Sequence, residues 1–258
     1  MIISIVNHKG GTGKTTTTIN LGSALAAQGY RVLLVDFDAQ GSLSYSLGID
    51  NSLPTIADVL VGEVPIQQII QKKESMDILP ATSSLADVEL AIAKADEHYH
   101  HLKTVLCELT GYDFILIDCP PSLSLLSLNA LTASAFVIVP MQMDVLALRG
   151  LDSMLETVKN ATRINPQLTV LGILTVMADT RKNIYQEILN HIKANYIEHL
   201  FSQAIHSSVK AAEAPSYGKS VVCHAPNSTT ACDYRAFSEE LIELLKLQYQ
   251  YSFAMAEA

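Results

Sequence analysis

The stretch Lys9-Gly10-Gly11-Thr12-Gly13-Lys14-Thr15-Thr16 decides the fold expected of this chain. It follows the apolar segment Ile2–Val6, which is typical of a buried strand, and it leads into a helical pattern over Thr15–Gln28. A strand, a glycine-rich turn and a helix are the arrangement that a phosphate-binding loop requires. The stretch matches the Gly-x-x-x-x-Gly-Lys-Thr spacing of such loops only loosely, because its glycines stand at 10, 11 and 13.

Each residue type in this loop has a chemical task. Glycines let successive backbone N–H groups turn toward phosphate oxygens. Lys14 places a positive charge on the β- and γ-phosphates, and the hydroxyl of Thr15 suits Mg²⁺. One lysine is enough for the loop's own phosphates, so Lys9 is a candidate to serve a nucleotide in another subunit. The predicted nucleotide-binding residues of the loop are Lys9, Gly10, Gly11, Thr12, Gly13, Lys14, Thr15 and Thr16.

Length and composition indicate a cytoplasmic enzyme with one domain over residues 1–258. The chain has 258 residues and is 49% hydrophobic, which is enough for a full core. No apolar run reaches the roughly 20 residues of a transmembrane helix, and the N-terminus does not resemble a signal peptide. The four cysteines show no Cys-x-x-Cys spacing, as expected of thiols in a reducing compartment.

Apolar runs alternate with helical patterns along the chain. Strands are predicted at Ile2–Val6, Arg31–Asp36, Met76–Leu79, Asp113–Asp118, Ala135–Pro140, Thr169–Val176 and near His199–Ile205. Helices are predicted at Thr15–Gln28, Ser84–Leu109, Ser122–Ala133, Leu146–Ile164, Ile184–Tyr196 and Tyr234–Gln248. This alternation predicts an α/β fold with a doubly wound, mostly parallel sheet flanked by helices.

Three aspartates are candidates for the chemistry of phosphoryl transfer to water. Asp118 ends an apolar strand, at the sheet edge where α/β ligands bind, and should hold Mg²⁺ through water, beside direct ligation by Thr15. Asp36 and Asp38 are separated by one residue and share a face in an extended strand. Asp38 lies beyond the strand end and is expected to orient the attacking water. Asp36 is the candidate for an indirect metal role, with capping of the following turn as the alternative.

The loop resembles the deviant Walker A motif of the ParA/MinD family of ATPases. Val35–Ser42 resembles the family's first switch, and Phe114–Ser122 resembles its Walker B motif and second switch. Glu213–Lys219 resembles a late motif of the ParA branch. The match has one departure, Ala39, where the family usually has proline, and this should loosen the first switch slightly. The chain begins at its first strand, so we expect no N-terminal helix-turn-helix extension of the kind found in larger plasmid ParA proteins.

The resemblance implies a P-loop ATPase that is slow and stimulated by a partner. ATP would join two subunits face to face, and Lys9 would reach the partner's phosphates in trans, as an arginine finger does. Lys9, Lys14 and Asp38 would then be the catalytic residues. Met177 resembles a family residue beside the adenine, although core packing is equally consistent, and Pro215 lies in a loop that touches the base in relatives.

Fewer sequence features indicate whether the ATPase binds a membrane or DNA. The C-terminal segment Gln248–Ala258 has no Lys or Arg, which argues against membrane binding. ParA-like relatives bind double-stranded DNA without sequence preference as ATP dimers, but a net charge of −9 does not indicate a nucleic-acid binder. A local patch would be needed, although a single lysine is more often part of a solvated face. The candidate DNA-binding residues are Lys182, Lys210, Lys219, Arg235 and Lys246.

Three functions are consistent with these features. The first is a ParA-type positioning ATPase on the nucleoid, which distributes a plasmid, a chromosome origin or a protein body with the help of an adaptor. A carboxysome-positioning role similar to that of McdA belongs to this class. The second is a MinD-like membrane-cycling regulator, which the uncharged C-terminal segment disfavours. The third is a metal-cluster relative such as the nitrogenase iron protein, but Cys107 and Cys119 do not stand in such a motif.

Overall fold

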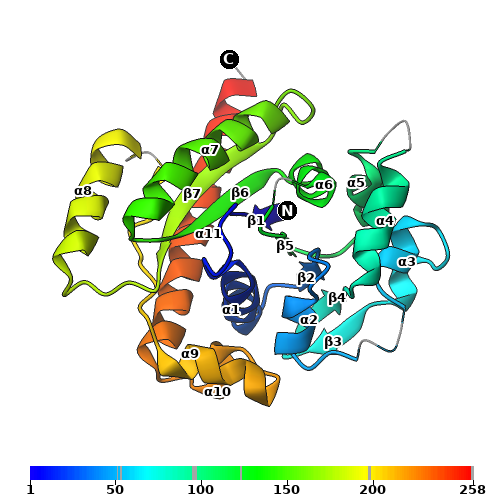
Figure 1. The fold of residues 1–258 in the computed structure, drawn as a ribbon, viewed down its shortest axis with the longest axis horizontal. Helices are drawn as coiled ribbons and strands as arrows, with labels where there is room; N and C mark the ends of the chain where they lie inside the picture. The colour runs from blue at the N-terminus through cyan, green and yellow to red at the C-terminus, as the bar shows by residue number, and fades with distance from the viewer. Residues whose placement is uncertain (51, 53, 95–97, 123, 197–198, 257–258) are drawn as a thin grey trace.

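One central sheet organises the molecule, with the strand order β3-β4-β2-β5-β1-β6-β7 (Figure 1). The computed structural model describes residues 1–50, 52, 54–94, 98–122, 124–196 and 199–256. The strands are β1 Ile2–Ile5, β2 Val32–Asp36, β3 Gln71–Lys73, β4 Met76–Leu79, β5 Phe114–Asp118, β6 Phe136–Gln142 and β7 Thr169–Val176. All neighbouring strands are parallel except β3 and β4. The predicted doubly wound, mostly parallel sheet is therefore confirmed.

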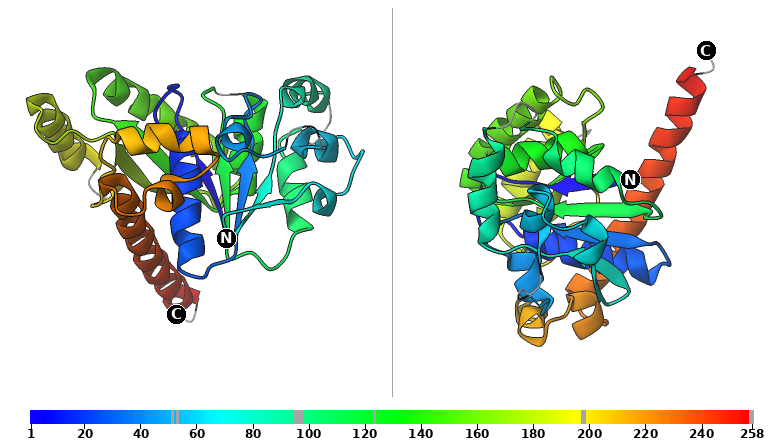
Figure 2. Two further views of the ribbon diagram at one scale, coloured as in Figure 1. Left: turned by 90° about the horizontal axis from the view of Figure 1, so that it is seen from below. Right: turned by 90° about the vertical axis from the view of Figure 1, so that its right-hand side faces the viewer.

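Helices cover both faces of the sheet and enclose two apolar cores (Figure 2). The first core involves α3 Ile56–Leu60, α4 Ser84–Ile92, α5 His101–Cys107, α6 Leu125–Ala133, α7 Val145–Ala161 and α8 Asn183–Tyr196. The second involves α1 Lys14–Ala27, α2 Ser42–Ser46, α10 Val221–His224 and α11 Thr229–Ala256. The shorter elements are η1 Ile66–Gln68, α9 Val209–Glu213 and η3 Ala214–Tyr217.

The two cores follow from the alternation of side chains along each strand. In β2, Leu33 and Val35 face the first core, whereas Val32 and Leu34 face the second. Every residue of this strand is buried, because helices cover both faces. The continuous apolar runs of the sequence thus form the interior strands, and their carboxyl ends meet at one edge of the sheet.

The helix predicted over Ser84–Leu109 is wrong as a single element. The structure has two helices in this range, α4 and α5, and residues 95–97 between them lie outside the described residues. The helix predicted from Ser122 begins at Leu125, with Ser124 as its N-cap in an extended conformation.

The strand predicted near His199–Ile205 is also wrong as a regular strand. This segment runs beside β7 with isolated pairing: the N–H of Phe201 donates to the carbonyl of Ile173, and the N–H of Ile205 to that of Thr175. Sequence analysis missed β3, which carries Gln-Lys-Lys and no apolar pattern. Its hairpin to β4 turns at residues 74 and 75, both of which have positive φ angles.

The last helix is longer than predicted. It runs over Thr229–Ala256 rather than Tyr234–Gln248, and its C-terminal part projects beyond the body of the molecule (Figure 2). Phe237, Leu241 and Leu245 of the predicted apolar face are buried against the second core. Within the described chain, none of the helices combines the length and apolarity that crossing a membrane would need.

Candidate functional site

The phosphate loop joins β1 to α1 at the carboxyl edge of the sheet. Gly13 forms the N-cap of α1 with φ 76°, a left-handed conformation that glycine adopts without strain. The positive end of this 14-residue helix faces a cavity of about 340 Å³. The cavity is lined by Gly10, Gly11, Gly13, Lys14, Thr15, Thr16, Asp38, Gln40, Ser42, Pro121 and Met177. The structure therefore brings most of the predicted loop residues together with Asp38.

The two lysines of the loop point in different directions. The Nζ of Lys14 lies 3.3 Å from the carbonyl oxygen of Lys9, inside the loop. Burial lowers the pKa of Lys14, and the nearby Asp118 acts against this. The Nζ of Lys9 instead donates to the Oδ2 of Asp144 at 2.7 Å, and Lys9 does not line the cavity. Thr12 supports the turn, because its hydroxyl donates to the same Lys9 carbonyl.

The predicted magnesium ligands lie in contact. The Oγ1 of Thr15 donates to the Oδ2 of Asp118 at 2.6 Å. The Oδ1 of Asp118 is buried and has no hydrogen-bond partner among the described residues. Burial, followed by the neighbouring Asp36, raises the pKa of Asp118 well above its usual range. A buried carboxylate oxygen without a partner, beside a threonine hydroxyl, fits a hard divalent cation such as Mg²⁺.

Asp36 lies next to Asp118 and binds the start of α2. The two are register partners on β2 and β5. The Oδ2 of Asp36 accepts the backbone N–H of Ser44 at 2.8 Å and its hydroxyl at 2.7 Å, which fixes the first turn of α2. Burial raises the pKa of Asp36 to about 6. These contacts support the capping alternative, and a role toward the metal stays a prediction.

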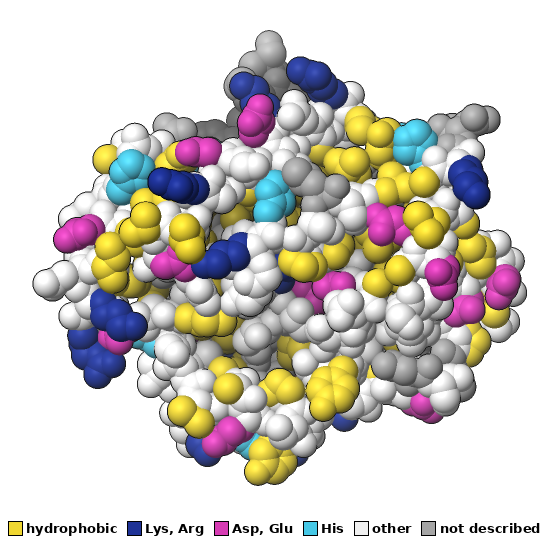
Figure 3. Space-filling model, viewed as in Figure 1, with side chains coloured by type: hydrophobic (Ala, Val, Ile, Leu, Met, Phe, Trp, Pro, Cys, Tyr) yellow, Lys and Arg dark blue, Asp and Glu magenta, His cyan; other side chains and the backbone are white. Residues whose placement is uncertain are grey.

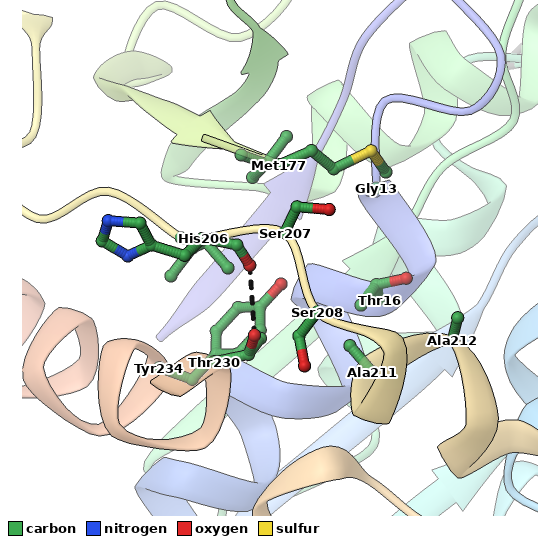
Figure 4. A pocket seen from close by; sticks show the side chains of 12 residues that line it. Gly13, Thr16, Met177, His206, Ser207, Ser208, Ala211, Ala212, Thr230 and Tyr234 are labelled. Carbon is green, nitrogen blue, oxygen red and sulfur yellow. Dashed lines mark hydrogen bonds between the residues drawn. The ribbon is translucent and has the colours of Figure 1, made fainter. Parts of the chain in front are cut away.

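A second cavity of about 260 Å³ adjoins the loop on the side of α11 (Figure 4). Its lining comes from Gly13, Thr16, Val176, Met177, Ile205, His206, Ser207, Ser208, Ala211, Ala212, Thr230 and Tyr234. Sequence analysis found only Met177 and the loop residues, since no motif marks the others. This cavity is the candidate site for the base of the nucleotide.

Met177 lies between the two cavities rather than in the core. It is 45% exposed with φ 52°, and its side chain extends toward Gly13 (Figure 4). The Nε2 of Gln142 contacts the sulfur of Met177 and the carbonyl oxygen of Gly11, at 2.7 and 3.1 Å. The core-packing alternative for Met177 is therefore wrong. Pro215 lies in η3 and does not line the cavity, so its contact with the base stays a prediction.

The wall of the second cavity is held by α11. The Oδ2 of Asp233 accepts the backbone N–H of His206 at 2.8 Å and lies 3.0 Å from its Nδ1. The hydroxyl of Thr230 donates to the carbonyl oxygen of His206 (Figure 4). The long final helix thus positions the chain that encloses the candidate base site.

Two of the five candidate DNA-binding residues are paired with carboxylates. Lys182 lies 3.8 Å from Asp179, and Lys210 lies 2.9 Å from Glu213, so their charges are partly neutralised. Among the residues that the structure describes, the other three make no ion pair with a carboxylate. These are Lys219, Arg235 and Lys246.

Known proteins align with this sequence over nearly its whole length. A family described as an AAA domain matches residues 1–170. The sporulation initiation inhibitor protein Soj of Bacillus subtilis is 39% identical over 246 residues, which are 93% of this chain and 97% of Soj. The chromosome partitioning protein ParA of Caulobacter vibrioides is 36% identical over 249 residues, 93% of each chain.

Solved structures share the fold. Cobyrinic acid a,c-diamide synthase from Mycobacterium smegmatis, with bound ATP analog and magnesium, superposes with a TM-score of 0.84, 35% identity and 95% coverage of both chains. The cell division ATPase MinD of Pyrococcus furiosus has a TM-score of 0.79 and 30% identity, over 94% of this chain and 98% of MinD. Apo McdA from Cyanothece, at 22% identity, has a TM-score of 0.82 over 95% of this chain and 98% of McdA, and shows the fold alone.

The sequence relatives, the matched fold and the joined phosphate and magnesium sites lead to one conclusion. The chain belongs to the ParA/MinD family of P-loop ATPases, with ATP and Mg²⁺ as its cofactors and partitioning ATPases of the ParA/Soj type as its relatives.

Proposed function

We propose that the chain is a ParA-type positioning ATPase that cycles between a monomer and an ATP-bound sandwich dimer. The position of Lys9 carries this proposal. Lys9 does not line its own phosphate cavity, and its side chain is 39% exposed, so it is available to a second subunit. In that subunit it would neutralise charge on the γ-phosphate as a group supplied in trans.

Exposed apolar side chains support the dimer. Several large ones lie on the segments that follow β2, β6 and β7, and Met177 among them lines both cavities of the site. They are Tyr45, Val145, Leu146 and Met177, with exposures of 76, 55, 69 and 45%. Two copies facing each other across their nucleotides would bury these side chains and bring each Lys9 to the opposite phosphates.

In the dimer, the chain would bind double-stranded DNA without sequence preference and so associate with the nucleoid. Lys219, Arg235 and Lys246 are the best candidates, since no carboxylate of the described chain pairs with them. Dimerisation would double the number of phosphates contacted, which makes binding dependent on ATP and on salt. An adaptor that stimulates hydrolysis would then release the protein and move its cargo.

The relatives favour one of the three candidate cargoes. The chromosome partitioning protein ParA, at 36% identity, favours a chromosome over a plasmid or a protein body such as a carboxysome. The MinD-like alternative has no support from the C-terminal segment, which carries no Lys or Arg after residue 246.

The test is binding to a random-sequence DNA duplex without nucleotide, with ADP and with ATP and Mg²⁺, at two salt concentrations. Binding only with ATP, weakened by salt, is the expected result. The variant Lys219→Glu should bind more weakly, whereas Lys103→Glu on α5 is the matched control and should not differ. The absence of DNA binding in every nucleotide state would overturn the nucleoid role.

A further inference from the structure

The second cavity has an uncharged lining. Among the described residues that line it, His206 is the only one that can carry a charge near neutral pH. In the space-filling view, the surface is hollowed over α1, and the side chains between this hollow and α9 are mostly uncharged (Figure 3). The cavity therefore fits the neutral base of a nucleotide rather than its phosphates.

One wall of this cavity is an irregular segment, residues 205–208, which we name the cavity wall. Ile205, His206, Ser207 and Ser208 all line the second cavity. His206 and Ser207 also line a further cavity of about 430 Å³. A segment that borders two cavities has fewer packed neighbours than a core strand, so its position depends more on hydrogen bonds.

The cavity wall is bonded to the end of β7 by backbone groups. The N–H of Ile205 donates to the carbonyl oxygen of Thr175 at 2.8 Å, and its own carbonyl oxygen accepts the N–H of Ala178 at 2.9 Å. The N–H of Ser207 donates to the carbonyl oxygen of Ala178 at 3.3 Å. In extended backbone, alternate residues bond to opposite sides, so the N–H and carbonyl of His206 face α11 instead.

The first turns of α11 hold both of these backbone groups. The Oδ2 of Asp233 accepts the N–H of His206 at 2.8 Å and lies 3.0 Å from its Nδ1. The hydroxyl of Thr230 donates to the carbonyl oxygen of His206 at 3.1 Å (Figure 4). The imidazole ring of His206 points away from Thr16, on the other side of the cavity (Figure 4).

Asp233 holds the cavity wall without lining the cavity. Thr230 lines the second cavity, whereas Asp233 does not and is only 7% exposed. Its Oδ1 also accepts from the Nε2 of Gln203 at 3.3 Å. A hydrogen bond to a carboxylate is stronger than one to a neutral acceptor, and its removal leaves the N–H of His206 without a partner. Asp233 can therefore act on a bound base only through the cavity wall.

Glu240, two turns further along α11, has the same kind of contact away from the cavity. Its Oε1 accepts the N–H of Ser202 at 2.7 Å, and its Oε2 accepts the N–H of Gln203 at 2.8 Å. Ser202 and Gln203 belong to the same irregular part of the chain but line neither of the two cavities. Asp233 and Glu240 thus differ in whether the backbone that they hold borders the candidate base site.

We propose that Asp233 is a positioning residue for the base of the nucleotide. It holds His206, and with it the cavity wall, where the wall can pack against the base. Its loss would remove the contribution of the base to binding and leave the phosphate loop unchanged. Asp233 would act in this way within a single subunit, so this role goes beyond the proposed function and does not depend on dimerisation or on DNA.

The test compares ADP with inorganic pyrophosphate, both with Mg²⁺, because the two share the phosphate groups and differ in the adenosine. Competition of each against a ribose-labelled fluorescent ADP gives its dissociation constant, and the ratio of the two constants measures the contribution of the adenosine. Asp233→Ala should bind ADP about tenfold more weakly and pyrophosphate as tightly as the wild type does. Glu240→Ala is the matched control and should keep the ratio within about twofold.

The conservative variant Asp233→Asn still accepts the N–H of His206 through its amide oxygen and should lose less ADP affinity than Asp233→Ala. Equal weakening of ADP and pyrophosphate in Asp233→Ala would indicate a general structural role and overturn the proposal. An unchanged ratio in Asp233→Ala, or the same loss in Glu240→Ala, would overturn it as well.

Two further comparisons keep the result decisive. If circular dichroism shows that Asp233→Ala does not fold, Asp233→Glu gives the same comparison, because it moves the carboxylate by one methylene and should also weaken ADP alone. ADP does not support the proposed ATP dimer, so a failure to dimerise or to bind DNA with ATP would count against the proposed function and leave the ADP comparison valid.

Discussion

The Nζ of Lys9 lies 2.7 Å from the Oδ2 of Asp144, so the chain's own carboxylate holds the lysine that is proposed to act in trans. Asp144 is also the N-cap of α7, where its side chain accepts the N–H of Ala147 at 2.8 Å. Both members of the ion pair are close to 40% exposed, at 39 and 38%. Solvent screens such a pair, so a partner's phosphate can replace Asp144 at little cost.

The variant Asp144→Asn should dimerise at a lower ATP concentration. Asparagine keeps the N-cap of α7 but removes the charge that holds Lys9. Exposed ion pairs contribute up to about 1 kcal/mol, which sets a decrease of up to about fivefold in the ATP needed. Sedimentation velocity over an ATP titration measures it, with Glu156→Gln on the same helix as the control. An unchanged or higher requirement for ATP would show that the ion pair does not restrain Lys9.

The variant Lys9→Ala should bind ATP and lose hydrolysis. Groups supplied in trans to a γ-phosphate contribute about 10³-fold or more to the rate, so stimulated turnover should fall to the background. Nucleotide binding by fluorescence and phosphate release measure the two properties separately. Lys14→Ala is the contrasting variant, because it should lose binding itself. Stimulated turnover at the wild-type rate in Lys9→Ala would exclude the role in trans.

The variant Asp38→Ala should trap the ATP dimer. Asp38 lines the phosphate cavity just beyond β2. We expect it to orient the attacking water, and a carboxylate contributes no positive charge to phosphate binding. Chromatography with light scattering should show a stable dimer with ATP and Mg²⁺ and none with ADP. If the variant stays monomeric with ATP, Asp38 has a structural role in the dimer rather than a hydrolytic one.

The phosphate loop could be predicted from sequence because its function is local. Gly13, Lys14 and Thr15 are adjacent, and the strand and helix that hold them are continuous with them. The partner of Thr15 was also predictable, since Asp118 ends a second buried strand at the same sheet edge.

The cavity that we assign to the base could not be predicted because four separate segments build it. Ser207, Ala211 and Tyr234 are ordinary residue types, and only the packing of α11 against α1 brings them beside the loop. The pairing of Lys9 with Asp144 spans 135 residues and likewise has no local signal. The β3 hairpin was missed because its side chains are polar and its turn depends on backbone conformation.

The burial of Asp36 predicts that the stability of the protein depends on pH. Burial raises its pKa from 3.8 to about 6, because the charged form loses solvation beside β5. The folded chain therefore binds a proton more tightly than the unfolded chain. The stabilisation is complete below pH 4, declines as the pH rises toward 6, and is lost above it. A pKa difference of about two corresponds to about 3 kcal/mol.

The variant Asp36→Asn should remove this part of the pH dependence. Its amide oxygen still accepts from Ser44 but does not ionise, so the free energy of unfolding should fall less between pH 4 and pH 7 than in the wild type. Urea unfolding at a series of pH values measures the difference, which we expect at about 3 kcal/mol. Asp118 has a pKa raised in the same direction and accounts for the decline that remains. Asp50→Asn, at an exposed site, is the control. If the free energy of unfolding of Asp36→Asn falls as steeply with pH as that of the wild type, burial does not raise the pKa of Asp36 in the folded chain.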